Sequence, residues 1–294
     1  MKTLIITGFV LICWALLSQN LIAQSDPIFL IQSDSIARIT LLDGSVFQGR
    51  IIKQTIQVTS LETESIGTID IPSEKIASIE FLDSERFREG EYWFENPNST
   101  RYLFSPTGIP LKKGEGYYQN TYVILQSFNY GITNNISIGG GFDVITPFVR
   151  ETPVFFFLSP KLGFKVAEKL HIGGGILYVN TSSFDLESLL IGYGVFTYGN
   201  TDNNITAGLG WGFVDGESNS KPIITISGMT RVSRRFGLVS ENWFIPTETY
   251  YGVLSYGMRF ISEKITVDFA FLNNRDIFEA IIIGIPYLDF VVKF

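Results

Sequence analysis

Segments of about ten residues in which bulky apolar side chains alternate with small or polar ones recur from residue 117 to the C-terminus. In the clearest segment, threonine and glycine fill the even positions while the odd positions carry Ile205, Ala207, Leu209, Trp211 and Phe213. Successive side chains of a strand point to opposite faces, so each segment predicts a strand with one apolar face. Soluble β-sandwiches alternate as well. The aromatic bulk of this face, repeated in segment after segment, favours a closed barrel with lipid outside and a polar lumen inside.

Turn chemistry divides this region into predicted strands near 117–130, 136–146, 153–164, 169–180, 188–198, 204–214, 222–232, 236–245, 250–261, 264–272 and 280–294. Tight polar connections such as 131–135 and 233–235 resemble periplasmic turns, and the longer ones between them would face outward. A further strand at 101–109, followed by an outer loop at 110–116, would bring the total to about twelve, an even number as in single-chain bacterial barrels. Pro106 and Pro286 predict that the first and last strands are bent or bulged.

The last predicted strand ends at the C-terminal residue. Its apolar face comprises Leu288, Phe290, Val292 and Phe294. This ending resembles the terminal strand of bacterial outer-membrane β-barrels, in which a final Phe is part of the signal read by the barrel-insertion machinery. Residues 96–120 are also similar to a segment of uncharacterised exported barrel proteins of Gram-negative bacteria. The resemblance implies an all-β, antiparallel transmembrane barrel with outer-membrane lipid and the insertion machinery as partners.

The N-terminus has the features of an export signal. Lys2 precedes an apolar run, and small and polar residues follow up to Ala23, so residues 1–23 are predicted to be a cleaved signal peptide. An uncleaved anchor is the alternative, although the run is short for one. Cys13, within the signal, is the only cysteine, which excludes disulfides and thiol chemistry from the mature chain. The net charge is −7, and −8 after loss of Lys2, which argues against a nucleic-acid partner.

Residues 27–82 form a separate compositional unit of five short predicted strands, 36–42, 46–52, 55–61, 66–71 and 76–81. Asp43-Gly44 between the first two is a strong hairpin signal. The pattern resembles the SH3-like and Sm-like small β-barrels, but the residues that bind RNA in the Sm family have no match here. The unit is interpreted as a small periplasmic domain that docks a protein partner, or alternatively as an extension of the main barrel. Residues 83–98 are interpreted as a linker and 99–294 as the outer-membrane barrel.

The candidate site consists of polar side chains that the alternation directs into the lumen. They are Asp143, Lys161, His171, Arg231, Glu241, Arg259 and Asp268. Arg259 and Asp268 fall on adjacent strands, within reach of a diagonal pair. Such charges either form salt bridges that fill the lumen or line a narrow path for a solute. The segment 110–116 is expected to be an outer loop, or alternatively a constriction folded into the lumen.

The sequence gives little support for a catalytic, phosphate-binding or metal site. His171 is the only histidine, and no motif around it supplies a nucleophile. The glycine triplets at 139–141 and 173–175 lie within strands, so they do not match a phosphate-binding loop and instead make room for lumen neighbours or bends. No cofactor and no metal site are expected.

The leading functional hypothesis is a non-enzymatic outer-membrane protein, a narrow or gated channel or a binding barrel for a small polar solute. The alternative is a closed structural barrel that anchors the periplasmic domain. A lipid hydrolase that uses His171 is the remote alternative.

Overall fold

The computed structural model describes residues 36–63, 66–88, 91–145, 148, 155–180, 188–214, 217–218, 220–248 and 250–294. The predicted signal peptide and the first residues of the predicted N-terminal domain therefore lie outside the described residues. The chain divides into two compact units, one ending at Trp93 and the other beginning at Phe94. The described part of the chain contains no helix long and apolar enough to cross a membrane.

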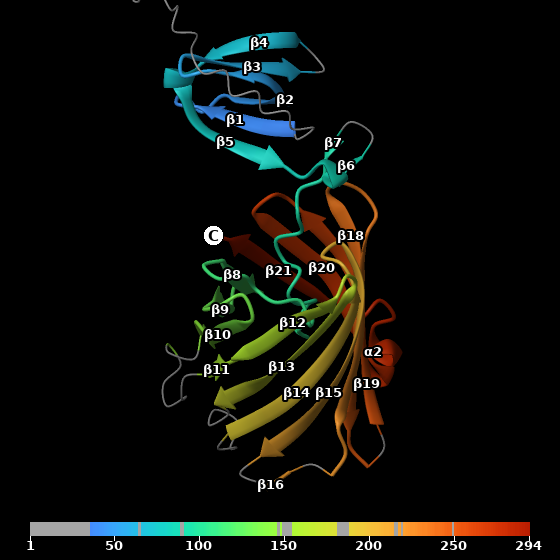
Figure 1. Ribbon diagram of the computed structural model, residues 1–294. Coiled ribbons are helices and arrows are strands. Elements are labelled where there is room, and N and C mark those ends of the chain that lie inside the picture. The colour runs from blue at the N-terminus through green and yellow to red at the C-terminus, as the bar shows by residue number, and fades with distance from the viewer. Residues whose placement is uncertain are drawn as a thin grey trace, which may run out of the picture. The chain divides into compact units, whose positions relative to one another are not determined.

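The first unit contains the predicted five-stranded antiparallel sheet, in the order β4-β3-β2-β1-β5 (Figure 1). Its elements are β1 (Ile36–Leu41), β2 (Val46–Gln54), β3 (Val58–Thr63), β4 (Gly67–Pro72), the 3₁₀ turn η1 (Ser73–Lys75) and β5 (Ile76–Leu82). Ala37, Ile39, Ile51, Leu61 and Ile71 form its buried core. The 3₁₀ turn η2 (Ser84–Arg86) and the short hairpin β6 (Phe87–Arg88) and β7 (Glu91–Tyr92) follow.

The turn between β1 and β2 follows the predicted Asp-Gly chemistry. Gly44 has a φ of +86°, a conformation in which glycine carries no steric penalty. The backbone amide of Ser45 donates to Asp43 Oδ1 at 2.8 Å, and this bond is the main cause that lowers the pKa of the exposed Asp43 carboxyl.

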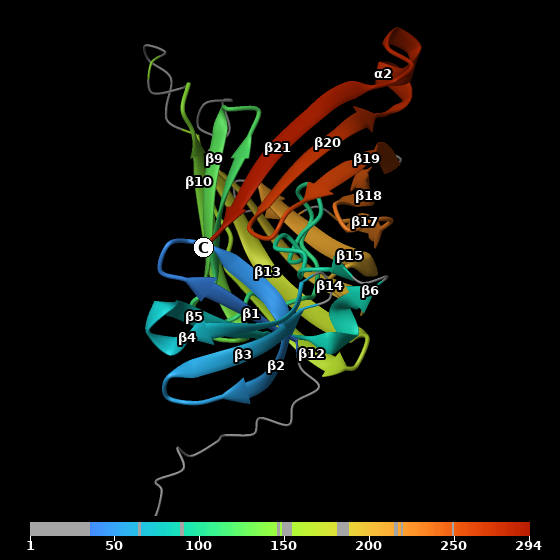
Figure 2. The same cartoon turned by 90° about the horizontal axis from the view of Figure 1, so that it is seen from above.

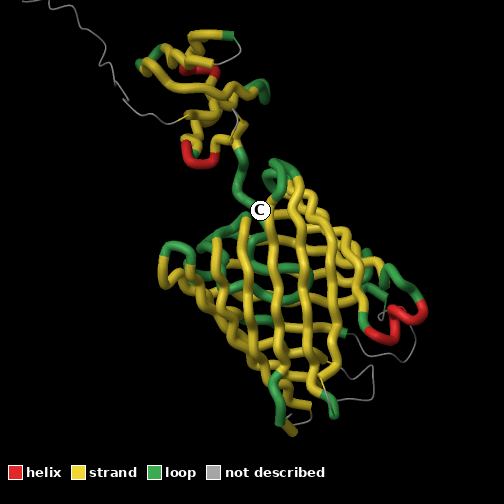
Figure 3. The backbone as a smooth tube through the Cα atoms, turned by 90° about the vertical axis from the view of Figure 1, so that its right-hand side faces the viewer, coloured by secondary structure: helices red, strands yellow, loops and turns green. Residues whose placement is uncertain are grey.

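The second unit is a closed antiparallel barrel of twelve strands (Figures 1 and 3). Its wall is built from β8 (Gly116–Thr121), β9 (Leu125–Gly131), β10 (Ile136–Asp143), β11 (Phe156–Leu158), β12 (Lys161–Ala167), β13 (Leu170–Asn180), β14 (Ser188–Gly199), β15 (Asn203–Val214), β17 (Ile223–Arg231), β18 (Phe236–Pro246), β19 (Tyr250–Ile261), β20 (Ile265–Asn273) and β21 (Ile285–Lys293). β11 and β12 count as one interrupted strand, because both pair with β10 and β13. β21 pairs with β8 and closes the ring. The short β16 (Glu217–Ser218) pairs with β15.

Bulky apolar side chains cover the outside of the wall. Along β15, Ile205, Leu209 and Trp211 are 55%, 47% and 43% exposed, whereas the alternate positions 206, 208 and 210 are buried. The same alternation places Leu288 and Phe290 of β21 outward. This is the reverse of a water-soluble barrel, and it gives the wall an outer surface suited to lipid.

The first predicted barrel strand is wrong, although the strand number is right. Residues 101–109 form only an isolated bridge between Arg101 and Pro106 and lie inside the barrel. The missing strand comes from 117–130, which is the hairpin β8–β9. Its turn residues Tyr122 and Val123 have φ of 55° and 66° without any glycine, asparagine or proline to mark them.

Two further predictions of the sequence are corrected. The segment 110–116 does not lie at the end opposite the turn 131–135, as an outer loop would, because the amide of Gly114 donates to Gly131 O and that of Gly116 to Phe294 O. It therefore lies at the end of the barrel where the C-terminus is, here called the Phe294 end. The last strand starts at Ile285 rather than at 280, because α2 (Arg275–Ala280) occupies the preceding connection. That connection marks the opposite end, here called the α2 end.

Candidate functional site in the barrel lumen

The lumen is filled by residues 94–111, here called the plug segment. Figure 2 shows it as a coil inside the ring of strands. Its buried side chains include Phe94, Asn96, Asn98, Thr100, Arg101, Tyr102, Leu103, Ser105, Thr107, Ile109 and Leu111. The predicted linker 83–98 thus ends inside the barrel. Burial at consecutive positions has no two-residue period, which explains why alternation gives no clue to this segment.

The plug segment enters the lumen and turns back on itself. The amide of Thr107 donates to Thr100 O at 3.0 Å, and that of Tyr102 donates to Ser105 O at 2.9 Å. Residues 102–105 are therefore the tip of the segment. Most of its other polar contacts are with side chains of the wall.

Glu241 in β18 holds the tip. Its carboxylate accepts hydrogen bonds from the amides of Leu103, Phe104 and Ser105 at 2.9, 3.0 and 2.8 Å. Trp243 Nε1 donates to its other oxygen at 2.7 Å. Successive amides that converge on one carboxylate form an anion-binding nest. Here the nest belongs to the plug segment and the anion to the wall.

Arg259 in β19 is completely buried and connects the wall to the incoming arm and the tip of the plug segment. It forms a two-pronged ion pair with Asp268, at 2.7 Å for each prong, and the two residues are directly opposed in the β19–β20 ladder rather than diagonal. Its guanidinium also donates to Asn98 O at 2.5 Å and to Tyr102 O at 2.8 Å. A single side chain thus uses its fork on a carboxylate and on the plug backbone.

Arg101 is a positively charged residue of the plug segment itself. Its Nη2 donates to Asp289 Oδ2 at 2.8 Å, and both side chains are buried. The hydroxyl of Tyr287 donates to the same Asp289 oxygen at 2.8 Å. The same hydroxyl makes a second, longer contact with Leu103 O at 3.2 Å. The last strand of the barrel therefore binds the segment that precedes the first.

Lys161 and Arg231 bind backbone carbonyls of the plug segment. Lys161 Nζ donates to Thr100 O at 3.0 Å and to Ile109 O at 2.9 Å. Arg231 Nη1 donates to Phe94 O at 2.6 Å and pairs with Asp202 at 2.9 Å. Lys161 therefore joins the two arms of the plug segment, and Arg231 binds the start of the incoming arm.

Asp143 and His171 are buried but do not hold the plug tip. Asp143 Oδ1 accepts from the amide of Ile145 at 2.9 Å near the α2 end. The Nδ1 atom of His171 has no hydrogen-bond partner within the described residues. No three His, Cys, Asp or Glu side chains of the described chain converge as metal ligands would.

Two glycines allow the plug segment to touch the wall. A Cβ on Gly108 would lie 2.8 Å from His171 O, and one on Gly173 would lie 3.1 Å from Gly108 Cα. The amide of Gly108 donates to Thr197 Oγ1 at 2.7 Å in the same region. The glycine of β13 therefore makes room for a backbone rather than for a bulky side chain.

Several residues of this network were missed from the sequence. Asp289 could have been found, since alternation in the last strand turns it inward, away from Leu288 and Phe290. Arg101 and Tyr102 gave no signal, because they lie in a segment predicted to be a strand. Tyr102 OH donates to Asn204 Oδ1 at 2.5 Å and contacts Thr206 Oγ1 at 2.8 Å.

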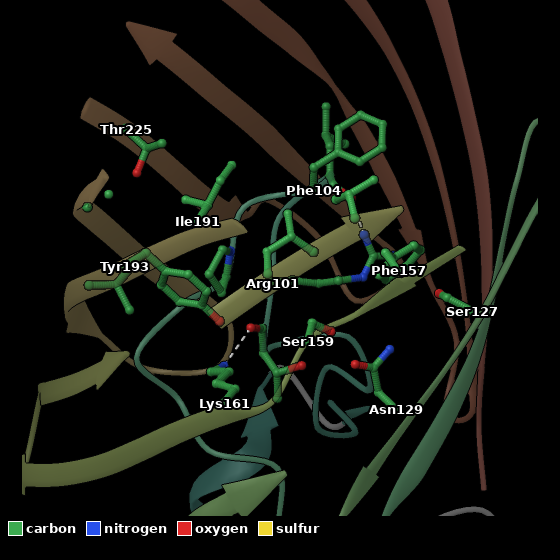
Figure 4. Close-up of a pocket in the computed structure, with 18 of the residues that line it drawn as sticks. Arg101, Phe104, Ser127, Asn129, Phe157, Ser159, Lys161, Ile191, Tyr193 and Thr225 are labelled. Atoms are coloured by element: carbon green, nitrogen blue, oxygen red, sulfur yellow. Dashed lines mark hydrogen bonds between the residues drawn. The ribbon is translucent and has the colours of Figure 1, made fainter. Parts of the chain in front are cut away.

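A cavity of about 370 Å³ remains beside the plug segment. Figure 4 shows Arg101 and Phe104 of the plug facing wall residues Phe157, Lys161 and Ile191 across it. The cavity lies along β8–β15 and reaches β17 and β18. It has the size and mainly apolar lining of a small-molecule site.

No protein-family model and no curated protein matches this sequence. Solved structures that align with it include the porin NanC, with a TM-score of 0.38 and 7% identity over 61% of this chain and 97% of that one. A loop-deletion mutant of OmpT, an outer membrane protein of Vibrio cholerae, aligns with a TM-score of 0.31 and 9% identity over 88% of this chain and 96% of that one. Both likenesses are distant.

Proposed function

We propose that this protein is an integral outer-membrane barrel that its own plug segment closes, and that it anchors the N-terminal five-stranded domain on the periplasmic side. The apolar outer wall supports the membrane location. The closed state is supported by one observation above all: Glu241, Arg259 and Lys161, side chains that could have lined a solute path, bind the backbone of the plug segment instead.

The energetics favour a stable closure at rest. Hydrogen bonds to charged groups contribute roughly 1.5–3 kcal/mol each. Removal of one partner of a buried ion pair costs about 3–5 kcal/mol. Opening a path through the lumen would leave the carboxylates of Glu241 and Asp289 without the amides and the guanidinium that they bind here.

A gated channel for a small polar solute is the second candidate. Side-chain hydrogen bonds hold the plug segment in the lumen, whereas the wall strands are joined by continuous ladders. A signal that breaks those side-chain contacts would release the plug segment without opening the wall. A lipid hydrolase remains the remote alternative, and full lipid-hydrolysing activity in His171→Ala would end it.

Single-channel recording in planar bilayers tests the closed state. We expect no conductance steps from the wild-type protein, and steps from the Arg101→Ala/Glu241→Ala double variant. Asp143→Asn is the matched control, because Asp143 is a buried lumen carboxylate that accepts a hydrogen bond from the backbone amide of Ile145. Regular steps from the wild-type protein would contradict the closed barrel and favour the channel.

A further inference from the structure

The cavity beside the plug segment has two chemically different parts. On β13, β14 and β17 its lining includes the apolar side chains Leu177, Val179, Ile191 and Ile223. On β9, β10 and β12, and at the residue between β11 and β12, it includes the polar side chains Ser127, Asn129, Ser137, Lys161 and Ser159. The lining is therefore amphipathic around the barrel wall.

The apolar part departs from the general pattern of this barrel. Many inward positions elsewhere carry polar or small side chains, as Thr197 and Thr206 do on β14 and β15. Leu177 and Ile191 break that pattern at positions that line the cavity. Apolar surface that faces water is unfavourable unless something apolar covers it. A hydrocarbon chain of a ligand would provide that cover.

The charge of the lining is positive only. Among the described residues that line the cavity, Arg101 and Lys161 carry charges and none is a carboxylate. Arg101 is paired with Asp289. Lys161 has three donors, of which two bind Thr100 O and Ile109 O. The third is left for an acceptor in the cavity, and an anionic group would be the complementary one.

We propose that this cavity binds a single-chain amphiphile with an anionic head. The hydrocarbon tail lies against Leu177, Val179 and Ile191, and the carboxylate or phosphate head lies at Lys161. The inference rests on the proposed closed barrel in one respect, since the plug segment supplies one wall of the cavity. The proposed ligand is therefore of a different class from the small polar solute expected from the sequence.

Equilibrium binding to the full chain in phosphatidylcholine nanodiscs tests the proposal, with empty nanodiscs as the blank. The probes are radiolabelled dodecanoate, dodecyl phosphate and dodecanol. We expect a saturable site for at least one of the two anions and binding at least about tenfold weaker for dodecanol. Comparison of the two anions identifies the head group as carboxylate or phosphate. Equal affinity for the anions and dodecanol, or no saturable binding above the blank, would overturn the proposal.

Two variants locate the tail and the head. Leu177→Trp fills the apolar part and should abolish binding, whereas Ile176→Trp, at an outward residue that is 44% exposed, should leave it unchanged. Lys161→Met should weaken anion binding at least about tenfold and leave dodecanol binding unchanged. An unaltered affinity in Leu177→Trp or Lys161→Met would overturn the placement of the ligand. A non-conducting wild-type protein that binds no probe overturns the cavity proposal alone, and a conducting one overturns the closed barrel.

Discussion

At Glu241 one carboxylate accepts hydrogen bonds from three consecutive backbone amides and is 1% exposed. A buried carboxylate is costly by several kcal/mol unless hydrogen bonds replace its hydration. The plug tip supplies that replacement, so the wall and the plug segment stabilise each other. Each would be left with unsatisfied polar groups if they separated.

Alternation along the strands shows which side chains point inward, and the structure places Glu241, Arg259 and Asp268 in the lumen. It does not show what those side chains bind. Their partners are carbonyls and amides of residues 94–111, and a backbone group carries no side-chain signature in the sequence. The choice between a filled lumen and a solute path therefore required the structure.

Gly173→Val should displace the plug segment, because its side chain would meet Gly108 Cα. We expect a loss of about 2–4 kcal/mol in the free energy of unfolding, in the range of overpacking together with lost buried hydrogen bonds. Urea unfolding in detergent, followed by the gel mobility of the folded barrel, measures it. Gly192→Val is the control, since a Cβ there meets nothing within 4 Å. Equal effects of both substitutions would show that the close approach is unimportant.

At the scale of elements, the strands with strong alternation were predicted well, whereas the first and last strands of the barrel were not. β14, β15 and β17 begin and end within a residue or two of their predicted bounds. The β8–β9 turn was missed because Tyr122 and Val123 are residue types that favour strands. Side chains compensate, as Asn120 Oδ1 accepts from the amide of Val123 and Gln126 Nε2 donates to Val123 O.

Val123→Asn should stabilise this turn. A β-branched residue at a φ of 66° is strained, whereas asparagine tolerates this region. We expect a gain of about 1 kcal/mol in the free energy of unfolding. Val232→Asn, at another exposed turn valine that does not have a positive φ, should give no gain. A gain of the same size in both variants would contradict strain at Val123 as the cause.

At the scale of the whole molecule, the proposal requires the N-terminal domain and the α2 end to be on opposite sides of the outer membrane. The mature chain predicted from the sequence has no cysteine, so single-cysteine variants report topology cleanly. In intact cells a membrane-impermeant maleimide should label Glu248→Cys, in the β18–β19 connection, but not Ser45→Cys. Ser45→Cys should become labelled only after the outer membrane is permeabilised. Labelling of Ser45→Cys in intact cells would contradict the proposed orientation.

The central claim is that residues 94–111 occupy the lumen, and a designed disulfide tests it most directly. Ser105 Oγ in the plug segment and Ser227 Oγ in β17 are 3.1 Å apart, close enough for the corresponding cysteines to approach bonding distance. In the oxidising periplasm, Ser105→Cys/Ser227→Cys should form an intramolecular disulfide, visible as a loss of thiol labelling after denaturation. The control Ser105→Cys/Ser240→Cys, which has its second cysteine on the neighbouring strand β18, should keep both thiols free. Two free thiols in the first variant, in a correctly folded barrel, would contradict a plugged lumen.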